Sequence, residues 1–197
     1  MVLKKAKLHT IYSQFEKQVA EFKHNAVCAL GCTFCCTNMG NVDITTLEGL
    51  IIRERLKRLP ERTRKGLSTR LTHNREERLN VRNTVCPFLD ARGSCRIYDV
   101  RPFSCRQLYS LRPCSEGAGP MIHRQASELS RQTVQEIQQL DHTGYSGNHS
   151  FILHLLDQPD FRKVYLSDGF DPRAIINFGK SHGIMINRHA AGEQVFR

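Results

Sequence analysis

Apolar side chains recur at steps of three and four residues over several stretches of this chain, which is the spacing of an amphipathic helix. The first stretch runs from Leu8 to Phe22 and predicts an opening helix. Thr45 and Glu48 have the spacing of a capping box, so a second helix is expected to begin there. Pro60 either ends that helix or opens the next one, a strongly basic helix predicted to reach about Val81.

The same spacing returns in the last third of the chain. It runs from Pro120 to Leu140 and predicts a long helix there, and residues 151–156 are apolar enough for a buried helix. Asp171-Pro172 and Gly183 frame a further helix by an N-cap, a first-turn proline and a C-terminal glycine. The alternation typical of strands is weak throughout, so the pattern predicts a mainly α protein.

Two central stretches, residues 25–41 and 86–114, break the helical period and are rich in cysteine and glycine. They are expected to form irregular loops, with one short hairpin turning at residues 91–93. The predicted architecture is therefore a small helical single domain with cysteine-rich irregular loops and one short hairpin around a metal site. It would span residues 1–197, with a cysteine-cluster core at 25–114 and a helical C-terminal part at 120–197.

Composition supports a globular protein: 40% of the 197 residues are hydrophobic and 24% are charged. No apolar run approaches the roughly 20 residues that a membrane span requires. The basic first ten residues lack the apolar stretch of a secretory signal. We therefore expect no membrane association and a reducing, cytoplasmic location for the thiols.

Much of the net charge of +10 lies in one segment. Between Arg53 and Arg82, a segment called the basic band below, 11 Lys or Arg residues stand against 4 Asp or Glu residues. Such a band can bind nucleic acid or an acidic partner. It can equally be the solvated faces of two helices beside an anionic cluster. No aromatic residues interleave the charges as stacking platforms, so nucleic acid is possible but not favoured.

Eight cysteines carry the chemistry, and all lie within residues 28–114. Thiolate is the form of cysteine that binds metals, and irregular loops allow several sulfurs to converge. A reducing compartment argues against disulfides, and four cysteines in nine residues is a poor way to build a core. Metal binding is therefore the favoured interpretation. The two groups are Cys28-x3-Cys32-x2-Cys35-Cys36 and Cys86-x8-Cys95-x9-Cys105-x8-Cys114.

The spacing favours an iron–sulfur cluster over zinc. Structural zinc usually shows two C-x2-4-C pairs, and only Cys32-x2-Cys35 has that spacing here. Adjacent Cys35 and Cys36 are poorly placed to chelate one small ion, which suggests that they serve different metals or different irons. Arg101 and Arg106 can donate hydrogen bonds to sulfur and offset the negative charge of a cluster, so they are candidate cofactor-binding residues.

The segment from Cys28 to Cys35 also has the three-cysteine spacing of radical S-adenosylmethionine enzymes. In those enzymes the loop follows the first strand of a large α/β barrel. The segment before Cys28 has helical period, and no alternation of strands and helices follows it. This enzyme class is therefore an alternative that the surrounding sequence does not favour.

Taken together, the cysteine motifs resemble the bacterial CxxxCxxCC cysteine-cluster family, described as a putative zinc- or iron-chelating domain. The resemblance covers about residues 25–110 and includes Cys86-Pro-Phe-Leu, Cys95-Arg-Ile-Tyr and Arg101-Pro-x2-Cys105-Arg106. It implies no role for Cys114. The cluster is also found in flagellin lysine N-methylase, which implies a possible protein-modifying role. The ligand set implied by the resemblance is Cys28, Cys32, Cys35, Cys36, Cys86, Cys95 and Cys105.

Three functional hypotheses follow. The first is a metal-binding protein with an iron–sulfur cluster, acting with a protein partner in a structural, redox or protein-modification and maturation role. The second is a zinc-stabilised module that binds nucleic acid or a partner through the basic band. The third is an enzyme, either of the radical S-adenosylmethionine type or protein-modifying. No Gly-rich nucleotide loop, HExxH helix or supported Ser/His/Asp arrangement identifies catalytic residues, so the sequence names no reaction.

Overall fold

The computed structural model of the protein describes residues 1–29, 31–39, 42–78, 80, 84–115 and 117–181. The described chain is mainly helical with one two-stranded sheet, which confirms the predicted class. None of its helices is both long enough and apolar enough to cross a membrane. The α-helices are α1 (Val2–Gln18), α2 (Phe34–Asn38), α3 (Thr46–Lys57), α4 (Glu61–Glu77), α5 (Phe103–Arg106), α6 (Arg124–Leu140), α7 (His149–Asp157), α8 (Pro159–Leu166) and α9 (Pro172–Ser181). The 3-10 helices are η1 (Glu21–Lys23) and η2 (Tyr98–Val100), and the strands are β1 (Asp43–Thr45) and β2 (Ser146–Asn148).

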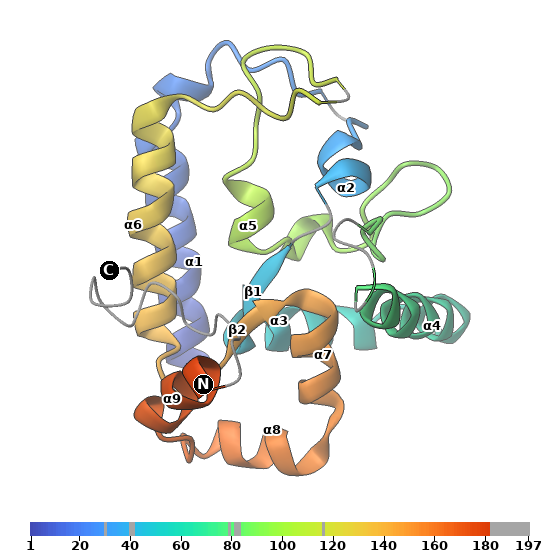
Figure 1. The fold of residues 1–197 in the computed structure, drawn as a ribbon, viewed down its shortest axis with the longest axis vertical. Helices are drawn as coiled ribbons and strands as arrows, with labels where there is room; N and C mark the ends of the chain where they lie inside the picture. The colour runs from blue at the N-terminus through green and yellow to red at the C-terminus, as the bar shows by residue number, and fades with distance from the viewer. Residues whose placement is uncertain (30, 40–41, 79, 81–83, 116, 182–197) are drawn as a thin grey trace.

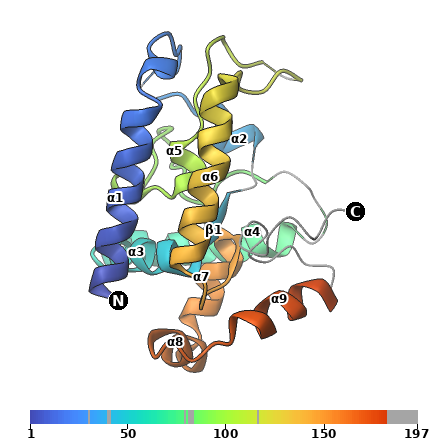
Figure 2. The same cartoon turned by 90° about the vertical axis from the view of Figure 1, so that its left-hand side faces the viewer.

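The two long helices α1 and α6 lie side by side and antiparallel (Figures 1 and 2). The apolar spacing that predicted the opening helix gives α1 a buried face of Leu8, Tyr12 and Phe15. This face joins Phe103 and Ile137 in one of two hydrophobic clusters that the described residues form. The helix begins earlier than the apolar pattern, at Val2, and ends at Gln18.

The second hydrophobic cluster is built by α3, α4, α7 and α8. It includes Ile52, Leu67 and Leu156, each no more than 1% exposed. Helix α3 approaches α7 so closely that a Cβ atom at Gly49 would lie 2.8 Å from Leu156 Cδ1. A larger residue at position 49 would therefore push these two helices apart.

A buried carboxylate, that of Glu48, connects three separate elements. The predicted capping box is confirmed, because Glu48 Oε2 accepts a hydrogen bond from the Thr45 backbone N–H at 2.8 Å. Glu48 Oε1 accepts from the Tyr12 hydroxyl of α1 at 2.6 Å. The same oxygen accepts from the backbone N–H of Phe103, the first residue of α5, at 2.7 Å. Glu48 thus fixes α1, α3 and α5 relative to one another.

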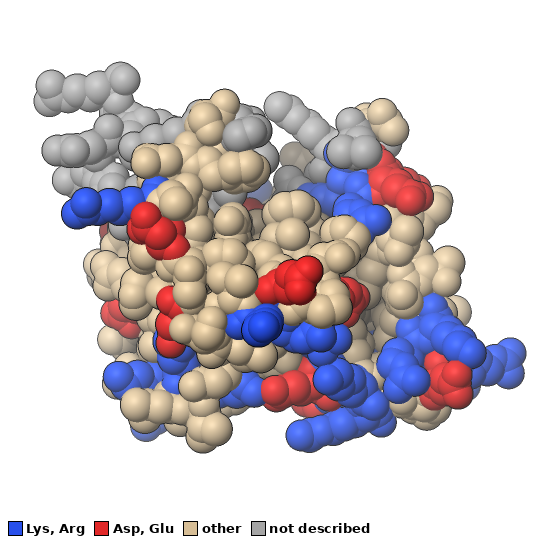
Figure 3. All heavy atoms as spheres, turned by 90° about the horizontal axis from the view of Figure 1, so that it is seen from below, with Lys and Arg blue, Asp and Glu red and all other residues tan. Residues whose placement is uncertain are grey.

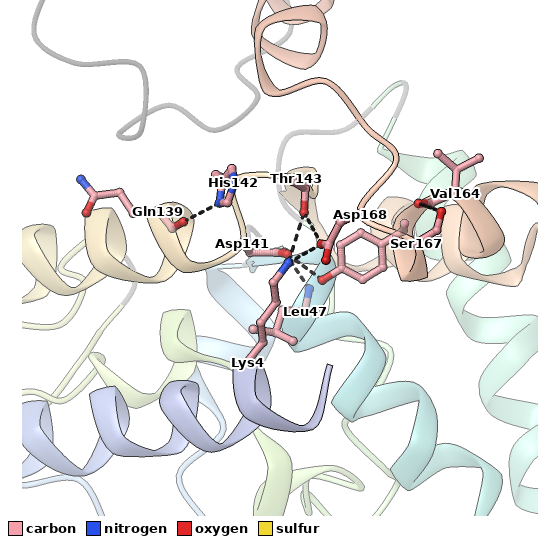
Figure 4. Close-up of polar contacts among 10 residues, drawn as sticks. Lys4, Leu47, Gln139, Asp141, His142, Thr143, Val164, Ser167 and Asp168 are labelled. Carbon is pink, nitrogen blue, oxygen red and sulfur yellow. Dashed lines mark hydrogen bonds and ion pairs between the residues drawn. The ribbon is translucent and has the colours of Figure 1, made fainter.

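Asp141, the residue after α6, plays a similar role for the C-terminal helices. Its Oδ2 accepts from the Leu47 backbone N–H of α3 at 2.8 Å, and its Oδ1 accepts from the Tyr165 hydroxyl of α8 at 2.6 Å. Figure 4 shows Lys4 reaching the same region, where it contacts Thr143 and Asp168. The start of α1 is thereby tied to the segment that follows α8.

Several elements differ from the sequence-based expectations. The segment 25–41, expected to be a loop, contains α2, whose first turn closes where Cys36 N donates to Thr33 O at 2.8 Å. Helix α8 was not predicted, and neither were strands β1 and β2, which are only three residues each and lack an apolar alternation. The basic helix α4 ends at Glu77. The expected ends at Val81 and Gly183 lie outside the described residues.

We predict that Glu48→Gln will destabilise the protein by about 3 kcal/mol, because an amide cannot accept hydrogen bonds from all of these donors and its NH2 group faces a donor. Urea unfolding followed by circular dichroism measures the change. The matched control is Glu54→Gln, whose half-exposed carboxylate pairs with Lys5, and its expected cost is below about 0.5 kcal/mol. Equal costs for the two variants would contradict the central role given to Glu48.

We predict that the stability difference between the wild-type protein and Asp141→Asn depends on pH. Burial raises the pKa of Asp141 to about 7 from a usual value of 3.8. A raised carboxyl pKa stabilises the fold below the unfolded-state pKa, and this contribution is lost as pH rises through about 7.

The Asn variant should therefore gain about 2 kcal/mol relative to wild type between pH 5 and pH 8. His149, whose pKa burial lowers to about 4, acts in the opposite sense but equally in both proteins, so it cancels. Urea midpoints at four pH values measure the difference, and a pH-independent difference would contradict the buried, proton-binding carboxyl.

Candidate metal centre

The cysteine-bearing segments lie in the upper half of the molecule as Figure 1 shows it: two loops cross above α1 and α6, and α2 and α5 lie below these loops, level with the two helices. The loop after η1 runs beside the loop that precedes α6 (Figure 1). They are joined where Val27 N donates to Ser110 O at 2.8 Å. This contact brings Cys28, from the first cysteine group, to the loop that carries Cys114, from the second group.

The two groups meet again at α2. The backbone N–H of Cys86 donates to the carbonyl of Cys36 at 2.8 Å, and the two thiols are hydrogen-bonded to each other. These residues are fifty positions apart in the sequence, and α3 and α4 lie between them. The intervening helices therefore return the second cysteine group to the first, as a common metal site requires.

The predicted hairpin is present around Gly93. Leu89 and Cys95 form an antiparallel bridge, and Arg96 N donates to Phe88 O at 2.9 Å. Gly93 has a φ of +75°, a conformation that residues with a Cβ rarely adopt. Asp90 stabilises the turn by accepting hydrogen bonds from two backbone N–H groups within it. The turn holds Cys95 close to the segment that begins at Cys86.

Helix α5 positions Cys105. Pro102 precedes its first turn, and Cys105 N donates to Pro102 O at 3.0 Å. The Phe103 side chain is buried against Phe15 of α1, at 4.7 Å between ring centroids, and its N–H is held by Glu48. The position of Cys105 is therefore fixed by the contacts that Phe103 makes with the hydrophobic core and with Glu48.

Backbone N–H groups favour ionisation of three of the thiols. The N–H of Ser110 acts on the Cys28 thiol, that of Phe88 on Cys86, and that of Ile97 on Cys95, and each lowers the pKa of its thiol. Backbone N–H groups directed at sulfur stabilise metal-bound thiolates and tune the potentials of iron–sulfur clusters. The local backbone is thus arranged to favour negative charge on sulfur.

Burial acts against ionisation, and it raises the pKa of the Cys28 and Cys95 thiols in spite of these N–H groups. It raises the pKa of Cys35 to about 11 and that of Cys105 to about 12. Cys36 differs, because a hydrogen bond from the Cys86 thiol lowers its pKa to about 7, and the same bond together with burial raises the pKa of Cys86. Metal binding at these positions must therefore release protons.

The eight thiols differ in exposure. All are free, and Cys28 and Cys32 are exposed, whereas Cys86 is buried at 8% exposure. Cys36 and Cys95 pack against the hydrophobic cluster that contains Cys86. The site therefore extends from the surface into the core.

Cys114, to which the resemblance assigned no role, lies with the other thiols. It is close enough to Cys28 and Cys35 to disfavour their ionisation. Its spacing alone could not reveal this, because the contact depends on the path of the loop between Cys105 and Cys114.

The two candidate arginines occupy different environments. Arg101 favours ionisation of the Cys95 and Cys105 thiols through its charge, and it stacks on the Tyr98 ring at 4.1 Å. Arg106 donates to Glu16 and to the carbonyl of Arg101, each at 2.9 Å. The contacts of Arg106 thus connect the Cys105 segment with α1.

The donor chemistry fits a thiolate-binding metal, because the groups gathered at this end are sulfur atoms with N–H donors and one cation around them. Among the described residues, no three His, Cys, Asp or Glu side chains stand close enough together to hold a metal ion as they are. Bringing enough thiols together around a metal ion would therefore require the loops to move. The exposed positions of Cys28 and Cys32 allow such a movement.

The chain belongs to the CxxCxxCC family, whose model is described as a "putative zinc- or iron-chelating domain" and matches residues 27–133, more than half of the sequence. The matched span contains all eight cysteines. Neither the curated proteins nor the solved structures gave a significant match.

Proposed function

We propose that this protein holds an iron–sulfur cluster on its cysteine loops. The observation that carries the proposal is the convergence of thiols from two distant segments, with backbone N–H groups directed at three of the sulfurs. Iron–sulfur clusters are held by cysteine thiolates and carry net negative charge, which the nearby Arg101 would offset. Among the family cysteines, Cys36, Cys86, Cys95 and Cys105 come from segments attached to the core, and Cys28 and Cys32 are exposed.

The proposed role is structural, redox or in protein modification and maturation, together with a protein partner. When bound, the cluster would supply one-electron chemistry or a rigid cross-link between loops. The exposed side of the site favours a protein partner, because the apolar side chains of Val27 and Met121 are 50% and 41% exposed there. Both are hydrogen-bonded to Ser110: the Val27 N–H donates to the Ser110 carbonyl, and the Met121 N–H donates to the Ser110 hydroxyl. The free thiols agree with the proposed cytoplasmic location.

The alternative is a zinc-stabilised module that binds nucleic acid or a partner through the basic band. Within the band, Arg53 pairs with Asp157 at 3.0 Å, Arg55 pairs with Asp99 at 2.8 Å, and Arg70 donates to the Leu89 carbonyl. Figure 3 shows acidic side chains beside or among the Lys and Arg clusters on the face that it presents. These contacts favour a structural and solvating role for the band.

We expect the protein, purified without oxygen, to be brown, with a broad absorption band near 400 nm and matching amounts of iron and acid-labile sulfide. Cys32→Ser should lower that absorption, because the cluster requires thiolate ligands. The control is Ser104→Ala, a change on α5 outside the proposed ligands, which should keep the colour. A colourless protein with stoichiometric zinc would support the alternative, and a protein without metal would contradict both.

A further inference from the structure

The thiols of the first cysteine group have one partner from the far end of the second group. The backbone places Cys28 beside the loop that carries Cys114, because Val27 N donates to Ser110 O at 2.8 Å. Cys32 and Cys114 both disfavour ionisation of the Cys28 thiol, and Cys114, Cys28 and Cys32 disfavour that of Cys35. Cys28 and Cys35 therefore each lie near Cys32 and Cys114.

The remaining four thiols form a second set of neighbours. Cys36 and Cys86 are joined by a thiol–thiol hydrogen bond and by a backbone hydrogen bond of 2.8 Å. The Cys95 and Cys36 thiols disfavour ionisation of Cys105 through their charge, and Cys105 disfavours ionisation of Cys86 in the same way. Cys95 also interacts with Cys36. This set comes from four different elements: α2, the start of the hairpin, its end, and α5.

The two sets adjoin at the peptide bond between Cys35 and Cys36, and Cys36 disfavours ionisation of the Cys35 thiol. Both residues lie in α2, where successive side chains are about 100° apart around the helix axis. Adjacent side chains that diverge by this angle are directed at different points. The geometry of α2 therefore separates the two sets at this peptide bond.

The sets also differ in their surroundings. In the first, Cys28 and Cys32 are exposed. In the second, Cys86 belongs to the hydrophobic cluster built with α3 and α7, Cys36 and Cys95 pack against it, and Cys105 follows the Phe103 segment that Glu48 holds. The second set is thus attached to the core, whereas two members of the first set are exposed.

We propose that the eight cysteines form two separate four-thiolate metal centres, an outer one of Cys28, Cys32, Cys35 and Cys114 and an inner one of Cys36, Cys86, Cys95 and Cys105. The inference rests on the proposed function, that these thiols bind metal, and adds the number of centres and a role for Cys114. Four thiolates suit both a tetrahedral zinc ion and a four-iron cluster. Cys114 supplies the fourth outer ligand that the first cysteine group lacks once Cys36 is directed inward.

The test uses four single variants of the full chain: Cys35→Ser and Cys114→Ser for the outer centre, and Cys36→Ser and Cys105→Ser for the inner centre. Each is reconstituted anaerobically with iron and sulfide, and in parallel with zinc alone. Metal per chain is measured by mass spectrometry, and folding by thermal unfolding. We expect each outer variant to lose half of the wild-type metal and keep a cooperative melting transition.

The double variant Cys35→Ser/Cys114→Ser should bind as much metal as either single variant, because both changes remove the same centre. The matched control Cys35→Ser/Cys36→Ser should bind almost none. The inner variants are expected to lower the melting temperature as well as the metal content. If they do not fold, the outer pair and its double variant still decide the proposal.

Full metal content in Cys114→Ser would overturn the division, and so would complete loss of metal in every single variant, which would indicate one shared centre. Chelator treatment of the wild-type protein gives a second measure. We expect the outer half of the metal to leave much faster than the inner half, whereas release in one phase would contradict the proposal. A wild-type protein that binds neither iron nor zinc would overturn the proposed function itself.

Discussion

The carboxylate of Glu48 is the interaction on which this structure most depends. It is buried, and it accepts hydrogen bonds from α1, from the residue before α3 and from the start of α5. A buried carboxylate that lost any of these donors would be costly, so the three elements are fixed together. Because Cys105 lies two residues after Phe103, the same carboxylate that joins the helices also fixes one of the thiols.

The thiol-bearing segments of the metal site are therefore not equally well fixed in position. The inner thiols belong to segments fixed by the core before any metal arrives, whereas Cys28 and Cys32 lie on exposed loops. Metal binding at the outer positions would order those loops, and its free energy would contribute to the stability of that end of the molecule. Binding at the inner positions would instead draw together thiols whose segments already pack on the core.

The sequence was informative wherever the signal is local. The apolar spacing predicted α1 and α6, the Thr45–Glu48 pair predicted the start of α3, and the turn residues around Gly93 predicted the hairpin. The short strands were not predictable, because Ser146–Asn148 has no apolar alternation and pairs with β1 only through contacts distant in the sequence.

The cysteine motifs identified the family and the kind of chemistry, but they could not show which thiols are neighbours. The proximity of Cys114 to Cys28 follows from the pairing of Val27 with Ser110, which no spacing rule encodes. Nor could the motifs show that Glu48 holds the segment of Cys105, because its capping role explains only the bond to Thr45.

The central claim is that metal is bound by sulfur alone. X-ray absorption spectroscopy at the metal edge of the anaerobically purified protein tests it most directly, because the method reports the donor atoms and their distances. We expect the nearest neighbours of the metal to be sulfur atoms only, at about 2.3 Å for zinc. A shell containing nitrogen or oxygen ligands at about 2.0–2.1 Å would contradict it.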